Sequence, residues 1–179
     1  MNQAKIQDGV KLILEGIGED LNREGIRETP GRVSSMFLEI FEGMHGEPDL
    51  NVAFTEEVSE DNFILIKDIP FYSFCEHHLL PFFGKIKILY IPKDNRVAGF
   101  SDLVRVVDLY SRRLQIQERL TNQIADKLME TLVPAGLRVV VEATQLCVTM
   151  RDRKALGTQT VTHATRGIIS IEQIPTEFL

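Results

Sequence analysis

The feature that most constrains the fold is a change in the spacing of apolar side chains near residue 63. Before this point apolar residues recur at helical intervals, which predicts one helix over residues 3–22 and a second over residues 29–43. Thr29 can cap the second helix, and Pro30 suits its first turn. After it, "FILIKDIPFYSF" and "GKIKILYIP" are rich in β-forming residues, and the second alternates as a half-buried strand does.

The remaining sequence repeats this order of elements. The stretch from Ser101 to Pro134 has helical spacing with a break near residues 113–115, which predicts two helices. "GLRVVVEATQLCVTM" and "TQTVTHATRGIISIE" predict two further strands. We therefore predict a single α+β domain of 179 residues, with a helical N-terminal extension over 1–62 and a core over 63–179. Its four-stranded antiparallel sheet has two helices on one side, and self-association is a natural way to cover the other.

Charge and hydropathy exclude some classes of protein. The net charge of −6 argues against a general nucleic-acid binder, and no apolar run approaches the roughly 20 residues of a membrane span. The N-terminal residues lack a secretory pattern, so we expect a cytoplasmic protein. Counting alone leaves a disulfide open for the two cysteines. In a reducing compartment, however, a thiol is more often buried, metal-bound or catalytic.

The segment "SFCEHHLLPFFG", residues 73–84, carries a thiol and two imidazoles among core-forming side chains. If the chain turns after the strand, Cys75 and His78 can reach one ion, and Cys147 also sits at the end of an apolar strand. Zinc accepts thiolate and imidazole, and three protein ligands with an open fourth position are typical of a catalytic site. The alternative is that both cysteines are small buried hydrophobes.

Other polar residues are candidates for chemistry around such a metal. His77 would be free for proton transfer, although a histidine hydrogen-bonded in the core is the alternative. Gln117 and Glu118 could read the edge of a guanine, or could lie on a solvated helix face. His45 and His163 are expected to be structural or at the surface.

Three arginines follow turns or strand ends. If Arg32, Arg105 and Arg151 converge, they could hold phosphates through charge-assisted hydrogen bonds. Taken one at a time, each is more typical of a solvated surface.

Several stretches together resemble the GTP cyclohydrolase I family. They are "ILEGIGEDLNREGIRETPGRV", "DIPFYSFCEHHLLPFFGKIKILYIP", "VAGFSDLVRVVDLYSRRLQIQERLTNQIADKL" and "VVVEATQLC", which follow the family order and cover most of residues 10–150. The resemblance implies the tunnelling fold, a ring-shaped homodecamer with active sites at subunit interfaces, and a guanine nucleotide as substrate.

The resemblance also implies a reaction. Zinc lowers the pKa of a water that attacks carbon 8 of GTP, the ring opens, and formate and 7,8-dihydroneopterin triphosphate result. Cys75, His78 and Cys147 would hold the zinc. The other roles carried over are the general acid/base for His77, guanine contacts for Gln117 and Glu118, a place near the ribose for Ser101, and triphosphate contacts for Arg32, Arg105 and Arg151.

Three positions depart from the family pattern. Gln145 stands where the family has a histidine, and an amide cannot shuttle a proton, a loss that typically costs about 10²–10⁴-fold. Asp102 replaces a lysine and Asp152 a glycine, so both add negative charge near the expected triphosphate. Arg153 and Lys154 follow directly and could offset that charge.

The departures leave several hypotheses about activity. The first is a zinc hydrolase that attacks carbon 8 of a guanine nucleotide. A divergent form of it would stop at a hydrated, formamido or 8-oxo purine, or would use a less phosphorylated substrate. A hypothesis of another class is a non-catalytic zinc-stabilised oligomer that binds a purine or a regulatory protein. A weaker one is a deazaguanine nitrile reductase, which needs a cysteine nucleophile, whereas Cys75 is expected to bind metal.

Overall fold

The structure is a computed structural model that describes residues 1–46, 53–55, 63–151, 155–169 and 174. The chain divides into two compact units, Met1–Glu42 and Gly43–Leu179. The boundary predicted at residue 62 lies outside the described residues and stays a prediction.

The N-terminal unit contains two helices, α1 over Gln3–Gly16 and α2 over Thr29–Ile40. The side chain of Asn2 caps α1 by accepting a hydrogen bond from the backbone N–H of Lys5. The predicted first helix is too long, because Gly18 adopts a left-handed φ of 87°. The backbone N–H groups of Gly18 and Glu19 then donate to Glu15 and Leu14, a pattern that ends a helix.

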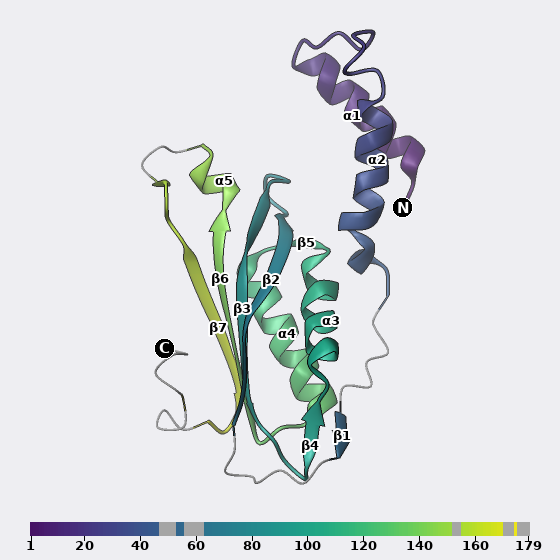
Figure 1. The fold of residues 1–179 in the computed structure, drawn as a ribbon. Helices are drawn as coiled ribbons and strands as arrows, with labels where there is room; N and C mark the ends of the chain where they lie inside the picture. The colour runs from purple at the N-terminus through teal and green to yellow at the C-terminus, as the bar shows by residue number, and fades with distance from the viewer. Residues whose placement is uncertain (47–52, 56–62, 152–154, 170–173, 175–179) are drawn as a thin grey trace. The chain divides into compact units, whose positions relative to one another are not determined.

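The second unit is built on a five-stranded sheet of order β5-β2-β3-β6-β7 (Figure 1). Its four long strands are antiparallel, as predicted, and comprise β2 (Ile64–Cys75), β3 (Pro81–Ile91), β6 (Gly136–Gln145) and β7 (Thr160–Gly167). The sequence analysis missed β5 (Leu114–Gln115), which is two residues long and pairs in parallel with the end of β2. A small second sheet pairs β1 (Ala53–Thr55) with β4 (Arg96–Ala98), and a 3₁₀ turn covers Glu42–Met44.

Two helices cover one face of this sheet, as predicted (Figure 1). They are α3 (Phe100–Ser111) and α4 (Gln117–Leu132), and β5 occupies the break between them. Alternate residues of the strands pack against the apolar sides of both helices, which is the arrangement that period-2 and period-3.6 patterns produce. The fully buried side chains of this core include Phe82, Ile86, Ile88, Tyr90, Leu103, Leu120, Ile124, Leu128 and Leu137.

The opposite face of the sheet carries charged and aromatic side chains. Lys87 pairs with Glu142 at 2.6 Å, and the rings of Tyr72 and Phe83 stack at 5.6 Å. Part of this face is covered by the chain itself, because Ile174 packs in a small buried cluster with Leu89 and Val140. Tyr72 remains 71% exposed, so the expectation of an uncovered face holds for part of it. Among the described residues, no helix is both long and apolar enough to cross a membrane.

Candidate metal centre and purine pocket

A tight turn after β2 brings Cys75 and His78 to one place. Cys75 is the buried last residue of the strand, and residues 76–79 form the turn. The backbone N–H of Leu79 donates to the carbonyl of Cys75 at 2.9 Å, and Leu79 takes a left-handed φ of 53°. The turn that the sequence analysis required is therefore present.

Cys147 reaches the same place from a different element. It lies on α5 (Leu146–Thr149), a single helical turn that follows β6, rather than in the extended strand that was expected. β6 pairs with β3, and β3 pairs with β2, so this end of the sheet brings Cys147 to Cys75. The possible ligand atoms of Cys75, His78 and Cys147 all lie within 4.8 Å of one another.

The donor set fits a transition metal. Two sulfurs and one imidazole nitrogen are ligands that zinc prefers, and three protein ligands leave a fourth position open. Both cysteines are free. Burial, followed by the proximity of Cys75, raises the pKa of the Cys147 thiol above its ordinary value. Two thiols this close resist losing both protons unless a cation compensates the negative charge, which a bound metal would do.

His77 lies beside this group and outside its three-residue set. Its Nδ1 is 3.9 Å from the sulfur of Cys75, and its side chain is 65% exposed. The rings of His77 and His78 are 6.4 Å apart and nearly perpendicular. An accessible imidazole next to the ligand group is placed to move protons, which is the predicted role.

An ion pair that the sequence analysis missed ties the turn to α4. The guanidinium of Arg119 donates to both carboxylate oxygens of Glu76, at 2.6 and 3.0 Å. These hydrogen bonds, together with the charge of Arg119, hold the pKa of Glu76 below its ordinary value. In addition, the backbone N–H of Glu76 donates to the carbonyl of Gln115. The turn is therefore fixed from two sides.

Next to the metal group is a cavity of about 230 Å³. It brings together six of the predicted site residues, namely Cys75, His77, Gln117, Glu118, Gln145 and Cys147. Its wall also contains residues that the sequence analysis did not single out, namely Gln115, Ile116, Val148 and Thr160. Only Gln115 gave a usable signal, because a polar residue between two apolar ones at a predicted helix break is a candidate for a buried, hydrogen-bonded amide.

The two glutamines in this wall are bonded to each other. Gln145 donates from Nε2 to Oε1 of Gln117 at 2.7 Å. Gln117 is only 3% exposed, and its Nε2 donates to the backbone carbonyls of Val141 and Thr160 at 3.0 and 2.9 Å. Both N–H donors of Gln117 are thus used within the protein, so its predicted guanine contact would have to use its oxygen.

Five predicted residues do not line this cavity, and one of them is His78 of the metal group. Ser101 and Arg105 lie on α3, and Arg151 follows α5. Arg105 donates to Asp102, one of the departing residues, at 3.1 Å. Asp152, Arg153 and Lys154 lie outside the described residues.

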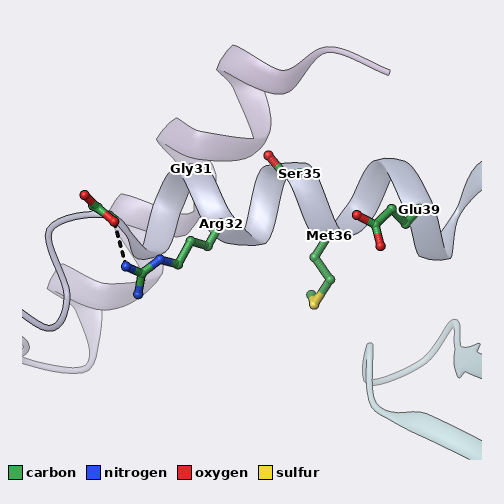
Figure 2. Close-up of a pocket in the computed structure, with 6 residues that line it drawn as sticks. Gly31, Arg32, Ser35, Met36 and Glu39 are labelled. Atoms are coloured by element: carbon green, nitrogen blue, oxygen red, sulfur yellow. Dashed lines mark hydrogen bonds and ion pairs between the residues drawn. The ribbon is translucent and has the colours of Figure 1, made fainter.

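Arg32 belongs to the N-terminal unit. It lies on α2 and donates to the carboxylate of Glu28 at 2.6 Å, as Figure 2 shows. Both residues line a surface hollow of about 500 Å³ on that helix, together with Ser35, Met36 and others. Nothing in this hollow resembles a metal or nucleophile site. The phosphate role of Arg32 stays a prediction.

Comparison with known proteins extends the resemblance to nearly the whole chain. The family model for GTP cyclohydrolase I matches residues 6–179. GTP cyclohydrolase 1 of Clostridioides difficile is 54% identical over 170 residues, which is 94% of this chain and 89% of that protein. GTP cyclohydrolase 1 of Geobacillus sp. strain WCH70 is 48% identical over 174 residues, covering 97% and 93%.

A solved structure supports the fold independently. The crystal structure of the archaeosine synthase QueF-Like in the apo form matches 60% of this chain and 96% of its own chain, with a TM-score of 0.50 and 18% identity. This likeness speaks for the fold alone, and it agrees with the predicted tunnelling fold. The family model and the relatives lead to one conclusion: the protein is an enzyme of the GTP cyclohydrolase I family.

Proposed function

We propose that the protein converts GTP and one water to formate and 7,8-dihydroneopterin triphosphate. The observation that carries this proposal is the group of Cys75, His78 and Cys147, with ligand atoms within 4.8 Å, at the edge of a cavity lined by Glu118 and His77. The names of the relatives, at about half identity over nearly the whole chain, support the same substrate.

We assign zinc to the metal group because its donors are two sulfurs and one imidazole. When bound there, zinc would act as a Lewis acid and lower the pKa of water to about 7. Cys75 and Cys147 contribute the negative charge that holds a divalent cation, and His78 contributes a neutral donor. The Glu76–Arg119 pair ties the turn that carries His78 to α4.

The other residues bind the substrate or move protons. Glu118 is exposed at the start of α4, has no ion pair among the described residues, and lines the cavity, so it can accept from the N–H groups of a guanine. His77 is the group that we expect to carry protons to and from the opening imidazole ring of the purine. Ser101, Arg32, Arg105 and Arg151 are the proposed ribose and triphosphate contacts.

The proposed enzyme is a ring-shaped homodecamer in the cytoplasm, with active sites completed at subunit interfaces. Two free cysteines committed to a metal suit a reducing compartment. The exposed ring of Tyr72 and the charged pairs on the open sheet face offer a surface for assembly. Mass measurement in solution tests the subunit number.

Two alternatives have specific support. Gln145 cannot carry a proton, so the reaction could stop at a hydrated or formamido purine. An 8-oxo purine would in addition need a two-electron oxidant. Arg105 is hydrogen-bonded to the carboxylate of Asp102, so it is less available to bind a phosphate. This favours a substrate with fewer phosphates, or a protein that binds a purine without turnover.

One experiment separates these functions. The zinc-loaded protein is incubated with GTP, GMP and guanosine, formate is assayed, and products are identified by mass spectrometry. Formate and dihydroneopterin triphosphate from GTP are expected. A mass gain of one water without formate indicates the divergent form. Tight binding without conversion indicates a non-catalytic protein.

A further inference from the structure

We infer that Gln117 is a positioning residue that fixes the amide of Gln145, and that it does not itself read the purine. The inference rests on the proposed function, because it assigns the glutamines different tasks in that reaction. It starts from a hydrogen-bond chain that runs from two backbone carbonyls through Gln117 to Gln145 at the cavity wall.

The amide of Gln117 has only one possible orientation. Its nitrogen lies 3.0 Å from the carbonyl oxygen of Val141 and 2.9 Å from that of Thr160. A carbonyl oxygen can only accept, so both neighbours require a donor. Rotating the amide by half a turn would place its oxygen against two acceptors in a site that is 3% exposed, where water cannot compensate.

The surrounding framework leaves Gln117 no freedom to move away. Gln117 begins α4, and the hydroxyl of Thr121 donates to its backbone carbonyl at 2.7 Å. That hydroxyl is in turn 2.6 Å from the hydroxyl of Thr162 on β7. Through its bonds to the carbonyls of Val141 and Thr160, the side chain of Gln117 therefore joins α4 to β6 and β7.

The orientation of Gln117 in turn determines that of Gln145. Because both N–H groups of Gln117 are used, its Oε1 faces outward as an acceptor, and residue 145 must donate to it. Gln145 does so from Nε2 at 2.7 Å. This hydrogen bond orients the amide of Gln145. The second N–H and the carbonyl oxygen of that amide do not take part in it.

The consequence is a division of labour in the cavity. Gln117 has no donor left for a purine, whereas Glu118, the next residue, is exposed and lines the cavity. Gln145 is the neutral group presented to the substrate in a fixed orientation, two residues from Cys147. A side chain at position 145 has to donate toward Gln117 in order to be held in place.

A double-mutant cycle tests this division. Gln117→Met and Gln145→Met each remove the hydrogen bond and keep side-chain length. We expect each to lower kcat/KM for GTP by roughly tenfold, the size of one buried hydrogen bond. We expect the double variant to be no worse than the worse single variant. The loss should divide between KM and kcat in the same way in both single variants, because both act through Gln145. Losses that multiply would overturn the inference, since Gln117 would then act on the substrate by itself.

The matched control is Gln115→Met, made both in the wild-type protein and in the Gln145→Met variant. Gln115 is also a buried amide in the cavity wall, but it donates to the carbonyl of Tyr110 and to Gln123 rather than to Gln145. Its effect should multiply with that of Gln145→Met. Unfolding midpoints measured for the same set provide a second readout, in which only the Gln117 and Gln145 pair should be coupled.

A second set of variants covers the case in which Gln117→Met does not fold. Gln145 is partly exposed, so it tolerates substitution. Gln145→His can donate a ring N–H to Gln117 and should keep activity, whereas Gln145→Glu and Gln145→Met cannot donate and should each lose about tenfold. Full activity of either non-donor overturns the inference. A wild-type protein that neither binds nor converts GTP overturns the proposed function instead, and the positioning role with it.

Discussion

The metal group and the proposed phosphate arginines differ in how completely one chain prepares them. Cys75, His78 and Cys147 come together through strand register and two short turns, so their ligand atoms already lie within 4.8 Å. Arg32 and Arg105 lie on helix surfaces, and each is already paired with a carboxylate one turn away. The metal group (the metal end) is preorganised by the sheet, whereas each proposed phosphate arginine (the phosphate end) would have to exchange its carboxylate for a phosphate.

This difference indicates which of the two ends should contribute more to metal affinity and to the rate of the reaction. A preorganised ligand group needs no rearrangement before it binds a cation, which favours tight metal binding. Exposed ion pairs such as Arg105–Asp102 contribute little to stability and are easily exchanged. Variants at the metal end should therefore have large effects, and variants at the phosphate end small ones.

The largest effect is expected at the metal ligands. Cys147→Ser replaces a thiolate donor with a hydroxyl, so both bound zinc and formate release should fall, the latter by at least about 10³-fold. Metal content and activity are measured on the same sample. Met150→Leu, an exposed residue after the same helical turn, is the control and should retain both. Retention of full activity without metal would contradict the assignment.

The next effect is expected at His77. His77→Ala should lower kcat by about 10²–10⁴-fold with the metal content unchanged, because the imidazole is outside the ligand group but beside Cys75. His163→Ala removes an exposed imidazole on β7 and serves as the control. If His77→Ala instead loses the metal, its role is ligation and not proton transfer.

A smaller effect is expected from loosening the turn that carries His78. Arg119→Leu breaks the two hydrogen bonds to Glu76 and should weaken zinc affinity by roughly tenfold, as loss of a supporting contact typically does. Arg166→Leu breaks a comparable pair with Asp126, which also lies on α4. Competition with a chelator measures both. Equal affinities in the two variants would show that the Glu76–Arg119 pair is not what holds the turn.

The smallest effect is expected at the phosphate end. Asp102→Asn frees Arg105 and should lower KM for GTP by roughly two- to fivefold, the range of an exposed ion pair, with no change for guanosine. Asp108→Asn removes the carboxylate that pairs with Arg112, the C-cap residue of the same helix, and is the control. An unchanged KM for GTP in Asp102→Asn would remove Arg105 from the phosphate site.

The four long strands and the helix pair could be predicted from the sequence because each left a local signal. The spacing of the cysteines and histidine left the metal group open, and its prediction rested on the resemblance to the family. Alternation identified the strands, and the spacing of Cys75 and His78 required only a turn after β2. The extent of α1 was overestimated because Ile17 and Leu21 continue the helical spacing, although the left-handed Gly18 ends the helix.

The hydrogen-bond network of the cavity could not be predicted in the same way. Gln117 and Gln145 are 28 residues apart, and nothing local indicates that one donates to the other. Likewise, Glu76 and Arg119 meet only because β2 ends beside the start of α4. Pairings of this kind depend on register between distant elements, which short-range patterns do not encode.

The central claim is that two thiolates and one imidazole hold a metal at the edge of the cavity that Glu118 and His77 line. X-ray absorption on the purified protein tests it directly, because it identifies both the metal and the atoms bound to it. We expect one zinc per chain, with two sulfurs at about 2.3 Å and a nitrogen at about 2.0–2.1 Å. A protein without metal, or a metal surrounded only by oxygen and nitrogen, would contradict the account.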